Sequence, residues 1–162
     1  MFFQNTTQKR SSLASKYIMK RILIIFSLLS SFLYANEIVK SPENVIRDFF
    51  YHFNSMNIEK INELWDVPIV YFVGQEIRVG KSYSEIVNYE NLKKGGWSYS
   101  KINSIEPVLV QNDFAIYKTN FTRFNDRDIE VLSSDTNLTL IKKNNIWKLK
   151  VAIIPINIPT GK

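Results

Sequence analysis

The sequence contains no cysteine and one histidine among its 162 residues. Without cysteine the chain can form no disulfide, no cysteine-ligated metal centre and no thiol nucleophile. With one histidine, a zinc site would have to consist mostly of carboxylates, which is unusual for zinc. The sequence also lacks a recognisable catalytic motif, metal-ligand cluster or phosphate-binding loop. We therefore expect no metal and no cofactor.

The apolar run near the start of the chain, residues 22–33, is shorter than the roughly 20 residues that a membrane-spanning helix needs. Lys20 and Arg21 precede it, and Tyr34-Ala35 followed by polar residues ends it. This is the layout of a secretory signal peptide over residues 19–35, cleaved after Ala35. An uncleaved N-terminal anchor is the alternative. Residues 1–18 form a polar extension, and Met19 is an alternative start.

A basic excess is absent from the body of the protein, although the net charge of the chain is +6. Five basic residues and no acidic residue precede Asn36, whereas 16 basic and 15 acidic residues follow. The body shows no basic stripe with interleaved aromatic residues, so we expect no nucleic-acid partner. Apolar residues make up 45% of the chain and aromatic residues 14%, which indicates a packed globular domain. Residues 36–162 are long enough for one such domain.

Residues 42–65 have the pattern of an amphipathic helical segment in two parts. Ser41 is a suitable N-cap, and Pro42 suits the first helical position, where its missing N–H costs nothing. Apolar residues at spacings of three and four form one wide face: Val45, Ile46, Phe49, Phe50, Phe53 and Met56. Asn57 can cap a second helix, which ends before Pro68 because the residue preceding proline disfavours the α conformation.

The rest of the sequence predicts mainly strands. We expect a hairpin of strands 67–73 and 77–79, a third helix over 83–94 that ends at Gly95-Gly96, and strands over 97–110, 114–124, 129–142 and 146–155. Proline should bend the strand near Glu106-Pro107, and residues 133–135 should form a bulge. Asn144-Asn145 predicts a tight turn. These elements fit one domain whose helices come first.

This order of elements resembles the nuclear transport factor 2-like superfamily, which includes the SnoaL-like proteins. The features that carry the resemblance are the Phe-rich first helix with its Asn57-capped partner, Leu64-Trp65-Asp66 leading into a strand, the hairpin ending at Val79-Gly80, Asp113 to Tyr117 opening a strand, and Lys143 to Leu149 with Trp147. The resemblance covers residues 41–155. It implies an α+β fold in which a curved mixed or antiparallel sheet wraps around three N-terminal helices as a cone with an apolar pocket.

Alternation along residues 115–123 places Ala115, Tyr117, Thr119, Phe121 and Arg123 on one face of a strand. A tyrosine and an arginine in an apolar cup could hold the carboxylate or carbonyl of a ligand. The predicted pocket consists of Phe49, Phe53, Trp65, Tyr71, Trp97, Tyr99, Tyr117, Phe121 and Arg123. The opposite face, with Phe114, Ile116, Lys118, Asn120 and Thr122, suits a dimer interface. A dimer through the sheet is also what the resemblance implies.

The candidates for a catalytic base are His52, at the border of the buried helix face, and Asp66, after Trp65. In ketosteroid isomerases of this superfamily the pocket holds an aspartate base and an oxyanion hole. The sequence offers no acid at an inward apolar position, because Asp126, Asp128 and Asp135 lie in expected turns or the bulge. The pattern therefore favours a non-catalytic protein.

Three functional hypotheses follow from the sequence. The first is an exported, non-catalytic domain, periplasmic or secreted, that binds a small apolar or amphipathic ligand or a protein partner through its cone. It would contact the membrane only through its signal sequence, before cleavage. The second is a small-molecule isomerase, dehydratase or hydrolase of SnoaL-like type with His52 or Asp66 as base. The third is a structural module of an envelope complex.

Overall fold

The computed structural model describes residues 40–155, and the predicted polar extension and signal peptide lie outside them. The elements are α2 (Pro42–Asn54), α3 (Ile58–Leu64), β1 (Trp65–Val73), β2 (Glu76–Gly80), the 3-10 helix η1 (Tyr83–Glu85), α4 (Tyr89–Lys94), β3 (Tyr99–Val110), β4 (Phe114–Phe124), β5 (Glu130–Lys143) and β6 (Ile146–Ile154). None of the helices in this part of the chain is long and apolar enough to cross a bilayer.

The two-part helical segment is confirmed, together with both of its caps. The Ser41 side chain accepts a hydrogen bond from the Asn44 backbone N–H at 3.2 Å, and the Asn57 side chain accepts one from Lys60 N–H at 3.1 Å. These bonds satisfy backbone donors that have no partner inside the helix. The predicted apolar face of α2 is buried from Val45 to Phe53. The chain then passes into β1 at Trp65, two residues earlier than expected.

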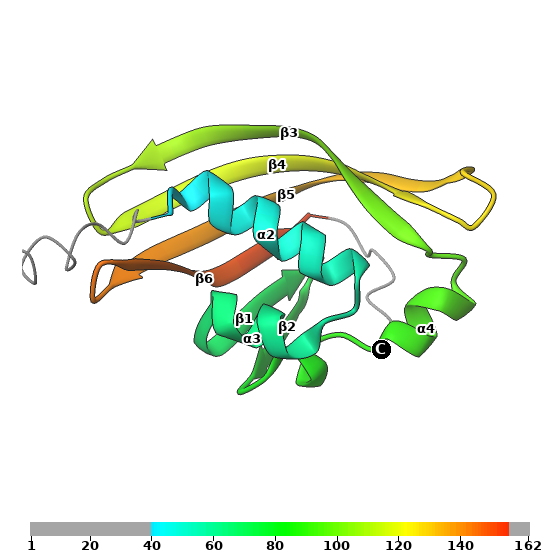
Figure 1. Cartoon of the computed structure of the whole chain (residues 1–162), viewed down its shortest axis with the longest axis horizontal. Coiled ribbons are helices and arrows are strands. Elements are labelled where there is room, and N and C mark those ends of the chain that lie inside the picture. Colours follow the sequence, from blue (N-terminus) through cyan, green and yellow to red (C-terminus); the bar gives the residue numbers. More distant parts are fainter. Residues whose placement is uncertain (1–39, 156–162) are drawn as a thin grey trace, which may run out of the picture. The chain divides into compact units, whose positions relative to one another are not determined.

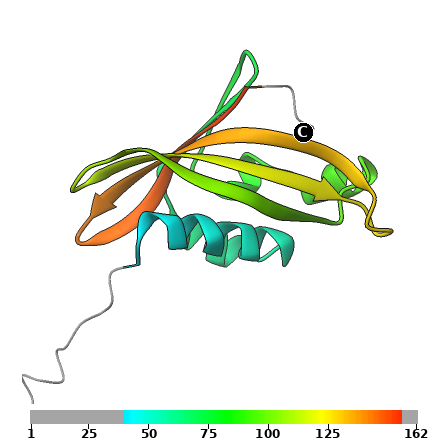
Figure 2. The same ribbon diagram turned by 90° about the horizontal axis from the view of Figure 1, so that it is seen from above.

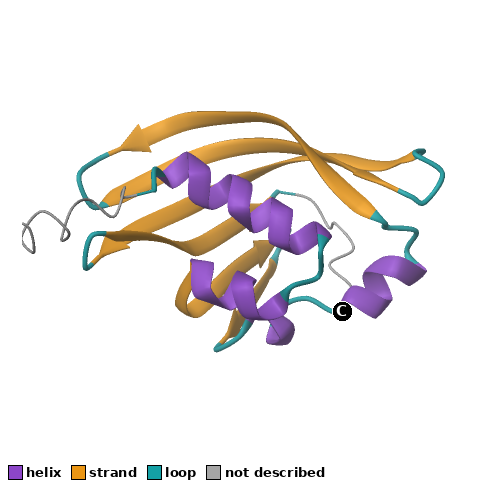
Figure 3. Cartoon of the chain, viewed as in Figure 1, coloured by secondary structure: helices purple, strands orange, loops and turns teal. Residues whose placement is uncertain are grey.

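The strands form one six-stranded sheet in the order β2-β1-β6-β5-β4-β3. β1 runs parallel to β6, and every other neighbouring pair is antiparallel. The sheet is curved, and α2 lies against its concave side (Figures 1 and 2). In Figure 3, which distinguishes helices and strands by colour, α2 crosses in front of the strands. The predicted α+β architecture, with a curved sheet wrapped around helices, is confirmed.

The single helix predicted over residues 83–94 is wrong, because the chain forms η1 and α4 with a break between them. Ile86 and Val87 in the break are both buried. Asn88 then adopts an extended backbone, and its side chain accepts a hydrogen bond from Asn91 N–H at 3.1 Å. An asparagine that caps a new helix stops the preceding one. The break turns Val87 towards the sheet.

The bulge predicted at residues 133–135 is also wrong. Ser133, Ser134 and Asp135 pair in unbroken register with Thr122, Phe121 and Asn120. Inward positions therefore alternate regularly along β5: Ser134, Thr136, Leu138 and Leu140 are all buried. In β3 the pairing with β4 is irregular between Pro107 and Leu109, near the predicted bend. β3 is an edge strand, where the missing N–H of proline is tolerated.

An aromatic cluster fills the space between α2 and the sheet. The ring of Phe49 lies 5.4 to 5.9 Å from the rings of Phe50, Phe53, Trp65 and Tyr83, mostly in edge-to-face geometry. Aromatic pairs at these separations add about 0.5–1.5 kcal/mol each beyond their burial. The three phenylalanines of α2 thus find their apolar partner in the concave face of the sheet, as the helix pattern requires.

Candidate functional site

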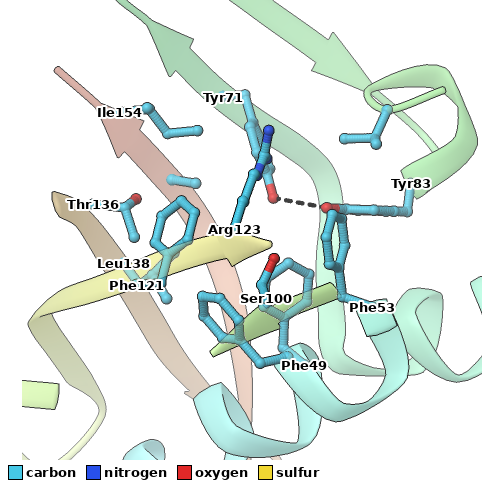
Figure 4. Close-up of a pocket in the computed structure, with 13 residues that line it drawn as sticks. Phe49, Phe53, Tyr71, Tyr83, Ser100, Phe121, Arg123, Thr136, Leu138 and Ile154 are labelled. Carbon is cyan, nitrogen blue, oxygen red and sulfur yellow. Dashed lines mark hydrogen bonds between the residues drawn. The ribbon is translucent and has the colours of Figure 1, made fainter. Parts of the chain in front are cut away.

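A small cavity of about 40 Å³ lies beside this cluster, between α2, η1 and strands β1, β3, β4, β5 and β6 (Figure 4). Its lining is mostly aromatic and aliphatic. It consists of Phe49, Phe50, Phe53, Tyr71, Tyr83, Val87, Ser100, Phe121, Arg123, Thr136, Leu138, Ala152 and Ile154. A volume of this size holds no more than a few water molecules. Side chains therefore occupy most of the interior of the cone.

Two tyrosine hydroxyls meet in the wall of the cavity. Tyr71 Oη donates a hydrogen bond to Tyr83 Oη at 3.4 Å (Figure 4). Burial raises the pKa of the Tyr71 hydroxyl, and burial raises the pKa of Tyr83 as well. Desolvation acts this way because it disfavours the charged phenolate. Both groups therefore remain neutral and able to donate a hydrogen bond at physiological pH.

Arg123 provides the charged group of the cavity. It lies on the inward face of β4 and is 8% exposed, and its side chain reaches the neighbourhood of Tyr71 (Figure 4). Its guanidinium carbon is 5.7 Å from the centre of the Phe121 ring. Burial lowers the pKa of Arg123, but arginine keeps its proton at any physiological pH. A permanent positive charge is therefore buried in an apolar wall.

The polar groups of the lining are hydroxyls and one guanidinium, and they include no carboxylate. Ser100 Oγ accepts a hydrogen bond from Trp97 Nε1 at 3.0 Å, and Thr136 Oγ1 donates to the Ile153 carbonyl at 3.1 Å. No aspartate, glutamate or histidine lines the cavity. The cavity can thus recognise an oxygen acceptor on an apolar molecule, but it holds no side chain suited to act as a general base.

Five of the nine residues predicted for the pocket line this cavity, namely Phe49, Phe53, Tyr71, Phe121 and Arg123. The other four lie elsewhere. Trp65 is buried in the core between Phe49 and Tyr71, with its ring 5.9 and 5.3 Å from theirs. Trp97 lines a second cavity.

Tyr99 and Tyr117 stand outside the cavity for reasons of strand geometry. Tyr99 precedes the inward-facing Ser100, so alternation turns it outwards, where its hydroxyl donates to Asp128 at 2.6 Å. Tyr117 faces inwards as predicted and is buried. It lies farther along β4, towards the first turn of α2. Burial is the main cause that raises the pKa of Tyr117, and the negative charge of Glu43 raises it further.

Neither predicted base lines the cavity. His52 is half-buried on α2, with its ring 5.1 Å from the ring of Tyr51. Asp66 forms ion pairs with Lys143 at 2.7 Å and Lys150 at 2.8 Å. The hydrogen bonds from these two lysines lower the pKa of Asp66. Neither side chain is therefore part of the cavity wall, and Asp66 is held by two lysines.

The sequence reasoning missed Tyr83, Ser100 and Thr136 among the polar lining residues. Thr136 could have been found by simple alternation from Leu138, had no bulge been assumed, whereas alternation from Trp97 leads to Tyr99 and misses Ser100. Tyr83 gave no signal, because it was assigned to a helix. In residues 40–155 no three histidine, aspartate or glutamate side chains gather as a metal site.

No protein-family model matches the sequence, and no functionally curated protein matches it significantly. Solved structures do match the fold. A protein of unknown function with a cystatin-like fold from Nostoc punctiforme is 16% identical with a TM-score of 0.59, over 69% of this chain and 85% of that one. A putative ketosteroid isomerase from Shewanella frigidimarina is 16% identical with a TM-score of 0.52, over 71% and 94%.

A putative scytalone dehydratase from Novosphingobium aromaticivorans is 15% identical with a TM-score of 0.54, over 69% of this chain and 78% of that one. At these identities the likeness shows the fold alone. The chain has the α+β cone fold of nuclear transport factor 2-like proteins. One fold of this kind supports many unrelated activities, so function has to be argued from the site.

Proposed function

We propose that this protein is a non-catalytic binding domain whose cavity takes a small, largely apolar molecule bearing a carboxylate or carbonyl oxygen. The observation that carries the proposal is the composition of the cavity wall. The guanidinium of Arg123 and the hydroxyls of Tyr71 and Tyr83 lie in an apolar lining that contains no acid. Such a wall offers hydrogen bonds to an acceptor and no group to abstract a proton.

An anionic oxygen suits this wall better than a neutral or cationic group. A ligand carboxylate next to Arg123 would receive charge-assisted hydrogen bonds, each worth about 1.5–3 kcal/mol. Apolar contacts with Phe49, Phe53 and Leu138 would hold the remainder of the molecule. The ligand class is therefore a small apolar carboxylic acid.

The alternative function, an isomerase or dehydratase, is supported only by similarity of fold. The names of two structural neighbours suggest such reactions for those proteins. An enzyme of that type would need a base within hydrogen-bond reach of the substrate. His52 and Asp66 do not line the cavity, and the proposal therefore assigns no catalytic role to this chain.

Export is the second part of the proposal. Residues 19–35 carry the charge and apolar pattern of a signal peptide, so the domain would act in the periplasm or outside the cell. Retention of residues 19–35 as an anchor is the alternative. The mass of the protein after expression in a bacterial cell distinguishes the two.

Native mass spectrometry of the protein accumulated from the full-length gene tests both parts. We expect the chain to begin at Asn36 and to carry a small molecule that an Arg123→Met variant loses. Methionine preserves much of the side-chain volume, which makes this variant a matched test of the charge. A wild-type protein with no retained mass, which also binds none of a panel of small apolar carboxylates, would contradict the binding function.

A specific observation favours a second function, association through the outer face of the sheet. Val79, Val70 and Val151 follow one another across β2, β1 and β6, and Ile77, Phe72 and Ile153 form the next row. Ile77 and Val79 are more than 60% exposed. We call these six residues the outer apolar patch. Contiguous exposed apolar rows of this kind mark protein interfaces.

The outer apolar patch lies on another part of the sheet than the surface predicted from β4. Around Lys118, Asn120 and Thr122 the face is polar: Asn120 donates to Asp135 at 2.8 Å, and Asn103 donates to both Asn120 and Thr122. We propose that a homodimer forms through the outer apolar patch, since one patch can pair with its own copy about a two-fold axis. A partner in an envelope complex is the competing occupant.

A further inference from the structure

Aliphatic side chains are exposed where β3 ends. Val108, Leu109 and Val110 are 62%, 41% and 52% exposed. Leu109 pairs with Ile116 of β4 on the convex face of the sheet, whereas Val110 pairs with the buried Ala115 on the concave face. The β3–β4 turn extends beyond the start of α2 (Figures 1 and 2). Both faces of this strand end are therefore open to solvent.

A further exposed aliphatic side chain lies in the neighbouring β5–β6 turn, where Ile146 is 53% exposed. The backbone N–H of Lys142 donates a hydrogen bond to the Asp113 carbonyl at 2.8 Å, so this turn touches the β3–β4 turn. Between the two turns, Phe114 and Ile141 are register partners, and both are half-buried. Aliphatic residues that gather in one place on a surface mark an interaction site. We call the exposed set the apolar tip; it consists of Val108, Leu109, Val110 and Ile146.

Lysines flank the apolar tip on the side of β5 and β6. Lys142 and Lys143 precede the β5–β6 turn, Lys148 follows it, and Asp113 is the one acidic residue in the two turns. Lys143 is paired with Asp66 at 2.7 Å. Within residues 40–155 no salt bridge involves Lys142 or Lys148. Two ammonium groups are thus available to an anionic partner.

A lipid bilayer fits this combination better than a folded protein does. A protein that docks on one face of the sheet would cover Leu109 or Val110 but not both. The interfacial region of a bilayer surrounds the end of a strand from both sides. Aliphatic side chains enter the acyl boundary there, while lysine ammonium groups stay at the level of the headgroups, and anionic headgroups attract them.

The place where the chain enters the domain supports the same partner. α2 begins at the end of the sheet that carries the apolar tip (Figures 1 and 2). Six residues separate the apolar run of residues 22–33 from Lys40. A chain of that length spans at most about 25 Å. While residues 22–33 occupy a membrane, before cleavage or as an anchor, the chain therefore keeps this end of the domain near the bilayer.

We infer that the apolar tip is a membrane-docking site. Its four aliphatic side chains insert into the interfacial region of a bilayer that contains anionic lipid, and Lys142 and Lys148 contact the headgroups. The site stays on the domain after cleavage, so the exported protein associates with a membrane surface. This differs from the sequence-based expectation that only the signal sequence contacts the membrane. The inference goes beyond ligand binding by the cavity and does not depend on it.

A single labelled cysteine tests the site, because the chain contains no cysteine of its own. Val110→Cys, made in the full-length gene, carries an environment-sensitive fluorophore at the apolar tip. Ile129→Cys is the matched control, since Ile129 is 55% exposed and lies in the β4–β5 turn at the other end of the sheet (Figure 1). We expect vesicles of equal parts phosphatidylcholine and phosphatidylglycerol to shift the emission to the blue at position 110 and to leave it unchanged at position 129.

Co-sedimentation of unlabelled protein with the same vesicles measures affinity. We expect Val110→Asp to weaken binding about tenfold and Ile129→Asp to leave it unchanged, and vesicles of phosphatidylcholine alone to bind the wild type about tenfold more weakly. If residues 19–35 are retained, every variant sediments, and the comparison of emission at positions 110 and 129 decides alone.

Three results would overturn the inference. They are the absence of a shift at position 110, equal shifts at positions 110 and 129, and, for protein that begins at Asn36, equal vesicle binding by Val110→Asp and the wild type. A shift at position 110 that grows with protein concentration in the absence of vesicles would also overturn it, and would make a second copy of this chain the occupant of the apolar tip.

Discussion

Two threonines that face each other across β4 and β5 differ in their hydrogen bonding. Thr119 and Thr136 are register partners, and both are buried. Thr136 Oγ1 donates to the Ile153 carbonyl, whereas Thr119 Oγ1 has no partner within residues 40–155. An unsatisfied buried hydroxyl costs about 1–3 kcal/mol, and a satisfied one contributes about 1 kcal/mol. The same substitution should therefore have opposite effects at the two sites.

We expect Thr119→Val to raise the free energy of unfolding by about 1 kcal/mol and Thr136→Val to lower it by about 1 kcal/mol. Valine has nearly the shape of threonine, so packing changes little at either site. Urea denaturation of the two variants and the wild type measures the difference. A loss of stability in Thr119→Val equal to that in Thr136→Val would show that the Thr119 hydroxyl is satisfied.

The buried tyrosines predict a loss of stability in alkali. Burial raises the pKa of Tyr71 and Tyr83 above the usual value of about 10. Below pH 10 both the folded and unfolded chains keep these protons, and pH has no effect through them. Above it the unfolded chain ionises first, so each tyrosine lowers the free energy of unfolding by roughly 1.4 kcal/mol per pH unit.

Tyr71→Phe should therefore reduce the slope of unfolding free energy against pH between about pH 10 and 11 by about 1 kcal/mol per unit, because the unfolded tyrosine is only partly ionised over that interval. Urea denaturation at a series of pH values gives that slope. Tyr51→Phe is the matched control, because it removes the same hydroxyl from a side chain that is 70% exposed. Equal slopes for Tyr71→Phe and the wild type would show that Tyr71 ionises freely in the folded protein.

One side chain attaches the end of α2 to the edge of the sheet. Asn54 Nδ2 donates to the Ser100 carbonyl and Asn54 Oδ1 accepts from Ser100 N–H, both at 2.8 Å. Ser100 also lines the cavity beside the α2 phenylalanines. This pair of bonds therefore fixes both the register of β3 against the helix and one wall of the site.

We expect Asn54→Ala to lower the free energy of unfolding by about 1–3 kcal/mol. The variant leaves the backbone carbonyl and N–H of Ser100 without the two hydrogen bonds that Asn54 provides. The Ser100 amide should also exchange its hydrogen faster. Asn91→Ala, at an exposed position of α4, serves as the control and should change stability by less than about 0.5 kcal/mol. Unchanged exchange at Ser100 in Asn54→Ala would contradict the attachment.

Local patterns were sufficient to predict most elements of the fold. Ser41 and Asn57 form the expected caps, and Asn144 and Asn145 both adopt positive φ in the predicted tight turn. The segment between Gly80 and Tyr89 was not predictable in this way. Its conformation depends on burial of Tyr83, Ile86 and Val87 under the sheet, and such tertiary contacts override helix periodicity.

The site was predictable only in part, for a related reason. Alternation along β4 identified Phe121 and Arg123, because strand geometry fixes which face a residue occupies. It could not say how far along the cone the cavity lies, and so Tyr117 was included although it packs near the first turn of α2. Trp65 was misassigned similarly: burial is readable from sequence, but the difference between core and cavity wall depends on packing.

The two faces of the sheet separate the two proposed functions at the scale of the whole molecule. The concave face packs against α2 and carries Arg123, whereas the convex face carries the outer apolar patch, and no helix of residues 40–155 covers it (Figure 2). Ligand binding and self-association would therefore use different side chains of the same strands. In β1, Tyr71 faces the cavity while Val70 and Phe72 face outwards. Substitutions on one face should leave the function of the other intact.

The proposed homodimer predicts that charged substitutions in the outer apolar patch weaken self-association. We expect the wild type to be a dimer at micromolar concentration, and Val79→Lys or Ile153→Lys to weaken association at least tenfold, because each buries an unpaired charge in the interface. Ile129→Lys is the control, since Ile129 is 55% exposed but lies in the β4–β5 turn, outside the patch. Sedimentation equilibrium measures the three variants and the wild type. A wild type that stays monomeric at about 100 µM would exclude the homodimer and favour a different protein as the occupant of the patch.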